Sequence, residues 1–214
     1  MGFFSSLFSP ASEEDNQQKV DQKNFDILKY DGIRAQRMGK PEYAYKCFTE
    51  ALKIQKDFET MKYLMSVCYM LNKHDQALEV LNEMVDAGQE PANTLLMRAN
   101  LFFTMERNTE AADDCMRVIE LEPENYLAYF QLAKAERALG KPDKSIDTLT
   151  HAIGVKDDFA EAYALRADIY HAQKCGKEAL TDIEKLIELT PEELYTYANA
   201  SEWVDVCKGW QEAD

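Results

Sequence analysis

Histidine and cysteine are the first residues in this chain to consider for chemistry, because both can bind metals or act in catalysis. The three histidines form no H-E-x-x-H pair, and only His171 and Cys175 stand four residues apart with ligand-type side chains. Zinc needs three or four ligands. No G-x-S-x-G nucleophile motif is present either. The residues therefore predict no metal site and no catalytic nucleophile.

The segment GIRAQRMGK, residues 32–40, has a superficial likeness to a phosphate-binding loop. A Walker loop has four residues between its glycines and Ser or Thr after its lysine, whereas here six residues intervene and Pro41 follows. Adjacent carboxylates such as Asp113 and Asp114 resemble a general acid and base, but such pairs are common on the solvated helix faces of an acidic chain. We therefore predict that the protein is not an enzyme and binds no cofactor.

Charge and cysteine usage narrow the possible partners and the compartment. The 214 residues include 24 basic and 39 acidic side chains, for a net charge of −15, which argues against a nucleic-acid ligand. The five cysteines form no C-x-x-C pair, as expected in a reducing compartment. No apolar run approaches the roughly 20 residues that span a bilayer, and the start lacks the features of a signal peptide. We predict a cytoplasmic protein.

A repeated sequence indicates how the chain is built. VIELEPENYLAYF at residues 118–130 returns as LIELTPEELYTYA at residues 186–198, an offset of two periods in a chain whose period is roughly 34 residues. Two series of small residues recur at this same period, and small side chains let paired helices approach closely. The first series is Gly32, Ser66, Ala99, Ala133, Ala167 and Ser201, and the second is Ala44, Ala77, Ala111, Ser145 and Ala179.

Between these positions the apolar residues follow the 3.6-residue period of amphipathic helices, with no alternating strand pattern. Turn sequences divide residues 24–193 into ten helices in five pairs, with repeats at about 25–58, 58–91, 92–125, 126–159 and 160–193. Residues 1–23 are predicted to form a flexible leader or a frayed helix start. Residues 194–214 carry Trp203, Val206 and Trp210 on one stripe and are either a capping helix or a truncated sixth repeat.

These residues resemble the tetratricopeptide repeat family, whose signature spans about 34 residues. The signature's early aromatic corresponds to Tyr129, Tyr163 and Tyr197, and its final proline to Pro123 and Pro191. The chain departs from the signature where Ala35 and Glu136 replace a later aromatic. The resemblance implies an all-α protein: a right-handed α-α superhelix of five helical hairpins plus a C-terminal helix.

In that family the first helices of successive hairpins line a concave groove that binds a peptide or a partner helix. Carried onto this chain, the ligand-contacting positions combine an apolar middle with flanking basic residues. They are Lys29, Ile33, Gln36, Arg37, Tyr63, Val67, Met70, Asn100, Phe103, Phe130, Lys134, Arg137, Asp168 and His171. The lysine and asparagine set of chaperone-tail adaptors is not reproduced, since Ile33 stands where asparagine is needed and Leu96 where lysine is needed.

Two functions follow as expectations. The first is a protein–protein interaction adaptor or scaffold, and the alternative is an assembly subunit that forms a homo-oligomer through its apolar surfaces. The tip MGFFSSLF fits a short acylation pattern through Gly2 and Ser6 and is apolar, but it has no basic residue, so membrane contact is not expected.

Overall fold

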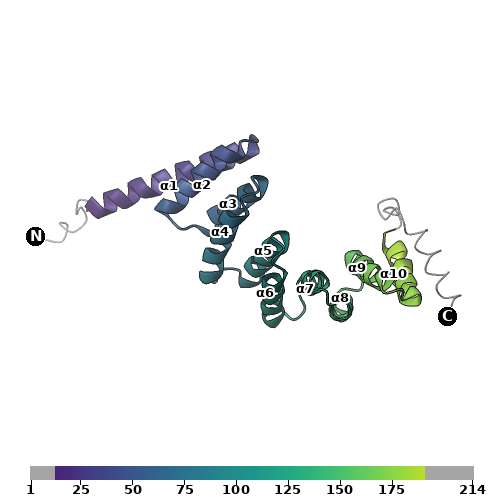
Figure 1. Cartoon of the computed structure of the whole chain (residues 1–214). Helices are drawn as coiled ribbons and strands as arrows, with labels where there is room; N and C mark the ends of the chain where they lie inside the picture. Colours follow the sequence, from purple (N-terminus) through teal and green to yellow (C-terminus); the bar gives the residue numbers. More distant parts are fainter. Residues whose placement is uncertain (1–12, 191–214) are drawn as a thin grey trace, which may run out of the picture. The chain divides into compact units, whose positions relative to one another are not determined.

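The computed structural model describes residues 13–190, which form ten α-helices (Figure 1). In chain order these are α1 (Glu13–Arg37), α2 (Pro41–Ile54), α3 (Phe58–Met70), α4 (His74–Asp86), α5 (Pro91–Thr104), α6 (Asn108–Leu121), α7 (Tyr126–Ala138), α8 (Pro142–Val155), α9 (Ala160–Ala172) and α10 (Gly176–Leu189). The apolar tip and the segment 194–214 lie outside the described residues. None of the ten helices combines the length and apolar character needed to cross a bilayer.

The helices pair into five successive hairpins, as the repeat predicts, and the chain divides into two compact units between Gln89 and Glu90. The first unit contains α1–α4 and the second α5–α10. Every hairpin turn has the same geometry: one residue has positive φ, and the next amide donates back to a carbonyl of the preceding helix. The residues with positive φ are Gly39, Asn72, Glu106, Gly140 and Lys174.

Helix α1 begins at Glu13, so of the two predictions for the leader segment the structure shows a helix start for residues 13–23. Three acidic residues occupy its first turn, where they interact favourably with the helix dipole. Gln17 Nε2 donates to Asp21 Oδ1 at 2.9 Å, and Gln22 Nε2 donates to Asp26 Oδ1 at 3.0 Å. These contacts between residues four apart support the helix beyond its hairpin partner.

Close approach within the first hairpin depends on Gly32. A Cβ built on this residue would stand 2.5 Å from Cε1 of Phe48, which is fully buried. Glycine therefore lets the Phe48 ring lie directly against the α1 backbone.

The first series of small residues was predicted to lie where paired helices approach closely. This prediction is wrong for Ser66, because Ser66 is exposed. The corresponding position in α3 is Met65, which is fully buried and precedes Ala77 by twelve residues, as Gly32 precedes Ala44. Repeat 2 therefore runs one residue earlier through α3 than the regular repeat period suggested. A methionine fits there because its flexible side chain adapts to an irregular space.

Candidate functional site

The predicted ligand positions come from the first helices of the hairpins, and those of the first unit lie on α1 and α3. Lys29 of α1 is mostly buried and ion-paired, with Nζ 3.0 Å from Asp57 Oδ2 and 2.5 Å from Glu59 Oε2. Burial alone would lower the pKa of Lys29, but the hydrogen bonds to Glu59 and Asp57 outweigh it and raise the pKa. Lys29 therefore links two repeats and is not a free cation for a ligand. On the same helix Ile33 is half-buried and Arg37 is exposed.

Asp57 completes this link as the N-cap of α3. Its Oδ2 accepts hydrogen bonds from the Thr60 backbone amide at 2.8 Å and from the Thr60 hydroxyl at 2.6 Å. Burial alone would raise the pKa of Asp57, but the bonds from Thr60 and Lys29 lower it overall. The carboxylate is thus held ionised where α2 leads into α3.

The one-residue shift in α3 also corrects the predicted surface. Val67 is fully buried and cannot face a ligand, whereas Ser66 accepts a hydrogen bond from Gln36 Nε2 at 2.9 Å. Tyr63 stacks on Phe48, with ring centroids 5.6 Å apart. Met70 is exposed. The shifted register places Lys62, Ser66 and Tyr69 at the positions that the sequence assigned to Tyr63, Val67 and Met70.

In the second unit, α5 and α7 bring a cation and two aromatic rings together. Lys134 Nζ lies 4.5 Å from the ring centre of Phe103 and 5.9 Å from that of Phe130. Phe130 is held in turn by an edge-to-face contact with Phe159, at 5.0 Å between ring centroids. Among the residues that the structure describes, no carboxylate forms an ion pair with Lys134. Asn100 is exposed on the same helix as Phe103.

A second contact joins α7 to α9. Arg137 Nη1 lies 3.1 Å from Asp168 Oδ2, and both side chains are about two-fifths exposed. This pair reduces the positive charge that the sequence assigned to Arg137. His171 is half-buried one turn after Asp168 on α9. We define the α5/α7/α9 surface as Asn100, Phe103, Phe130, Lys134, Arg137, Asp168 and His171.

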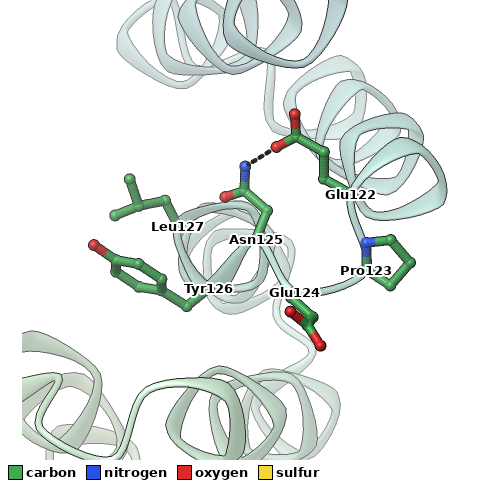
Figure 2. Close-up of a pocket in the computed structure, with 6 residues that line it drawn as sticks. All are labelled: Glu122, Pro123, Glu124, Asn125, Tyr126 and Leu127. Carbon is green, nitrogen blue, oxygen red and sulfur yellow. Dashed lines mark hydrogen bonds between the residues drawn. The ribbon is translucent and has the colours of Figure 1, made fainter.

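A shallow open pocket lies at the turn between α6 and α7, lined by residues 122–127 (Figure 2). Asn125 caps α7, because its Oδ1 accepts from the Ala128 amide at 3.1 Å while its Nδ2 donates to Glu122 Oε2 at 2.7 Å. These polar groups are therefore explained by the helix start. Within residues 13–190, no three His, Cys, Asp or Glu side chains gather to hold a metal ion.

The buried cysteines are packing residues. Burial raises the pKa of Cys68 to about 11 and that of Cys115 to about 12. Both thiols are therefore protonated at neutral pH, and a protonated thiol is a poor nucleophile. Cys207 lies outside the described residues.

Comparison with known proteins identifies the repeat. Residues 96–154 and 130–193 match the family model described as Tetratricopeptide repeat. Among curated proteins, serine/threonine-protein phosphatase T of Trypanosoma brucei brucei (strain 927/4 GUTat10.1) is 30% identical over 122 residues, which is 57% of this chain and 25% of that protein. The chain spans a quarter or less of the length of the first curated relatives that it matches.

Solved structures share the arrangement of helices. The crystal structure of MamA protein has a TM-score of 0.70 and 22% identity, covering 82% of this chain and 96% of that chain. TTC0263, a thermophilic TPR protein in Thermus thermophilus, has a TM-score of 0.61 and 19% identity, covering 86% and 98%. At these identities the likeness concerns the fold.

Stacked helical hairpins of this kind form a solenoid, a class of protein that presents extended surfaces for binding. Residues 96–193 match the tetratricopeptide repeat, and the structure has the fold of tetratricopeptide repeat proteins. Repeats of this family generally act as scaffolds for protein–protein interaction.

Proposed function

We propose that this protein is an interaction adaptor whose α5/α7/α9 surface binds a peptide segment carrying apolar anchors and at least one acidic group. The observation that carries the proposal is the position of Lys134, whose ammonium group lies over Phe103 and Phe130. Aromatic rings hold the cation in place without neutralising its charge.

The two rings supply the apolar part of the surface. Phe103 and Phe130 are each only partly buried, so both retain area that a ligand can cover. Phe130 is also fixed from behind by Phe159, which limits the entropy lost when a ligand packs against it.

Charge supports an acidic ligand at this point. Lys134 lacks a carboxylate partner among the described residues, whereas Arg137 already pairs with Asp168. In a chain of net charge −15, an unpaired lysine on an apolar surface favours a carboxylate from another molecule. This proposal is narrower than the sequence-based surface, because Lys29 and Arg137 are largely occupied within the fold.

A phage-displayed library of random 16-residue peptides tests the proposal with the full chain as bait. The wild type is expected to enrich peptides that combine aromatic or branched apolar residues with Asp or Glu. Lys134→Glu should shift the enriched peptides toward basic residues. Phe103→Ala should reduce enrichment by removing an anchor, which is typically worth about 2 kcal/mol or more at a hot spot.

Lys177→Glu is the matched control, because Lys177 is an exposed lysine of α10 outside this surface. It should enrich the same peptides as the wild type. If Lys134→Glu and Phe103→Ala, both folded by circular dichroism, also select the same peptides as the wild type, this surface does not bind the ligand.

A further inference from the structure

Helix α1 presents an outer face that its own unit leaves uncovered. It has 25 residues against 14 in its hairpin partner α2, so its first part extends beyond the hairpin. Its packed face is marked by Phe25, Gly32 and Ala35, which are buried. The opposite face is exposed along the helix.

That outer face carries both large apolar and basic side chains. We call this set the α1 seam: Val20, Lys23, Ile27, Tyr30, Arg34 and Arg37. Its residues follow one another at steps of three and four, the spacing of the a and d positions in a heptad. Val20 is 51% exposed, Ile27 50% and Tyr30 68%, so three apolar side chains offer area to a partner.

The charge of the seam is opposite to that of the whole chain. Lys23, Arg34 and Arg37 are exposed, as is neighbouring Lys19, and none of the four forms an ion pair with a described residue. The carboxylates of Asp21 and Asp26 on the same helix accept hydrogen bonds from Gln17 and Gln22. A basic, partly apolar stripe thus lies on a protein whose net charge is −15.

We propose that the α1 seam is a docking site for an acidic amphipathic helix of a partner protein. The three-and-four spacing fits the ridge of another helix, and apolar residues between charges match an interface with a dry centre and a polar rim. A partner with carboxylates beside its apolar stripe complements Lys23 and Arg34. Pairing of two seams from identical chains would instead bring these cations together.

This docking site is separate from the peptide surface proposed above. The seam residues lie on α1 of the first unit, whereas Phe103 and Lys134 lie on α5 and α7 of the second. Arg37 also belongs to the sequence-predicted peptide positions, so it is left unchanged in the variants below.

Two synthetic 21-residue helical peptides test the inference by fluorescence anisotropy with the full chain. Both carry leucine at a and d, and one carries glutamate and the other lysine at e and g. The acidic peptide is expected to bind and the basic peptide not to bind. The double variant Lys23→Glu, Arg34→Glu should bind the acidic peptide at least about tenfold more weakly than the wild type does, and it should bind the basic peptide.

Two further variants separate the apolar contribution from the second surface. The double variant Ile27→Ala, Tyr30→Ala should bind the acidic peptide more weakly than the wild type does, because both side chains lose their contact area. Because the acidic peptide also suits the α5/α7/α9 surface, the seam substitutions are repeated in a Phe103→Ala background. They should weaken binding there as well, so a failure of the peptide surface remains distinguishable from a failure of the seam.

Three results would overturn the inference. The first is binding of neither peptide. The second is binding of the acidic peptide that is unchanged in the folded Lys23→Glu, Arg34→Glu variant. The third is a dimer of the chain, seen by light scattering, that Ile27→Asp dissociates, since the seam would then be occupied by a second copy.

Discussion

Arg166 and Asp182 form a bidentate ion pair across the fifth hairpin: Arg166 Nε donates to Asp182 Oδ2 at 2.8 Å, and Arg166 Nη2 donates to Asp182 Oδ1 at 2.7 Å. Arg98 and Asp114 form the same pair two repeats earlier, in the third hairpin, at 2.7 and 2.8 Å. In the fourth hairpin the corresponding residues are Leu132 and Thr148. The third and fifth hairpins thus share a feature that the hairpin between them lacks.

Arg166→Leu is expected to destabilise the fifth hairpin strongly. The substitution leaves Asp182, which is 3% exposed, as a buried carboxylate without its cation, and such a loss costs about 3–5 kcal/mol. Adding Asp182→Thr, which installs the residues of the fourth hairpin, should restore much of the stability. Urea unfolding of both single variants and the double variant measures the coupling free energy between Arg166 and Asp182. Losses of stability that simply add in the double variant would contradict this coupling.

Gly32→Ala is expected to destabilise the first hairpin by about 1–3 kcal/mol, because the new methyl group would overlap the Phe48 ring. Gly154→Ala is the control: Gly154 lies in α8, and a Cβ there meets nothing within 4 Å. That change should stabilise the protein by up to about 1 kcal/mol, since alanine favours helix. Thermal unfolding followed by circular dichroism compares the two, and equal shifts would contradict the close approach.

The corrected register in α3 predicts opposite sensitivities at two adjacent residues. Met65→Ala should cost about 2–5 kcal/mol, because it leaves a cavity in the core of the first unit. Ser66→Ala should change stability by about 0.5 kcal/mol or less, because the serine is exposed. Denaturant unfolding distinguishes the two variants. A larger loss of stability for Ser66→Ala than for Met65→Ala would contradict the corrected register.

The link between Lys29 and Asp57 predicts a pH dependence in the first unit. The pKa of Asp57 is lowered in the folded state, so its contribution is present above the unfolded pKa and is lost as pH falls through the folded pKa. The pKa of Lys29 is raised, so its contribution is present below the unfolded pKa and is lost as pH rises through the folded one.

Lys29→Met should therefore destabilise the protein most between about pH 5 and pH 9, by on the order of 1 kcal/mol, with the difference from wild type shrinking in acid. Lys53→Met is the control, since Lys53 and Glu50 form an exposed pair that should contribute little. Unfolding midpoints across pH test both variants. A constant difference down to about pH 2 would show that Asp57 does not depend on this lysine.

Much of the fold could be predicted because its signals are local. The turn sequence LGKPDK at residues 139–144 contains Pro142, where α8 begins, and the turn sequence MGKPEY at residues 38–43 contains Pro41, where α2 begins. Proline and glycine act through the backbone of their own segment, and the 3.6-residue period is visible within a single helix. The same local signals left residues 13–23 open between a leader and a helix start, and side-chain contacts four residues apart support the helix there.

The candidate surface could be predicted only in outline. Family positions found the group around Phe103, Phe130 and Lys134, because α5 and α7 keep the regular repeat. In α3 the sequence assigned Ser66 to the series of small buried residues, because serine is small and lies one repeat period after Gly32. The structure instead buries Met65 at the equivalent position.

The sequence by itself determined the helical period, the five hairpins and the resemblance to tetratricopeptide repeats, because each depends on residues close together in the chain or on a spacing that repeats along it. Only the tertiary structure decided which charges remain available to a ligand. Lys29 is paired with Asp57 and Glu59 at the start of α3, and Arg137 is paired with Asp168 of α9, whereas Lys134 lies over aromatic rings. Such pairing depends on where neighbouring repeats place their side chains in space, which a single repeat does not encode.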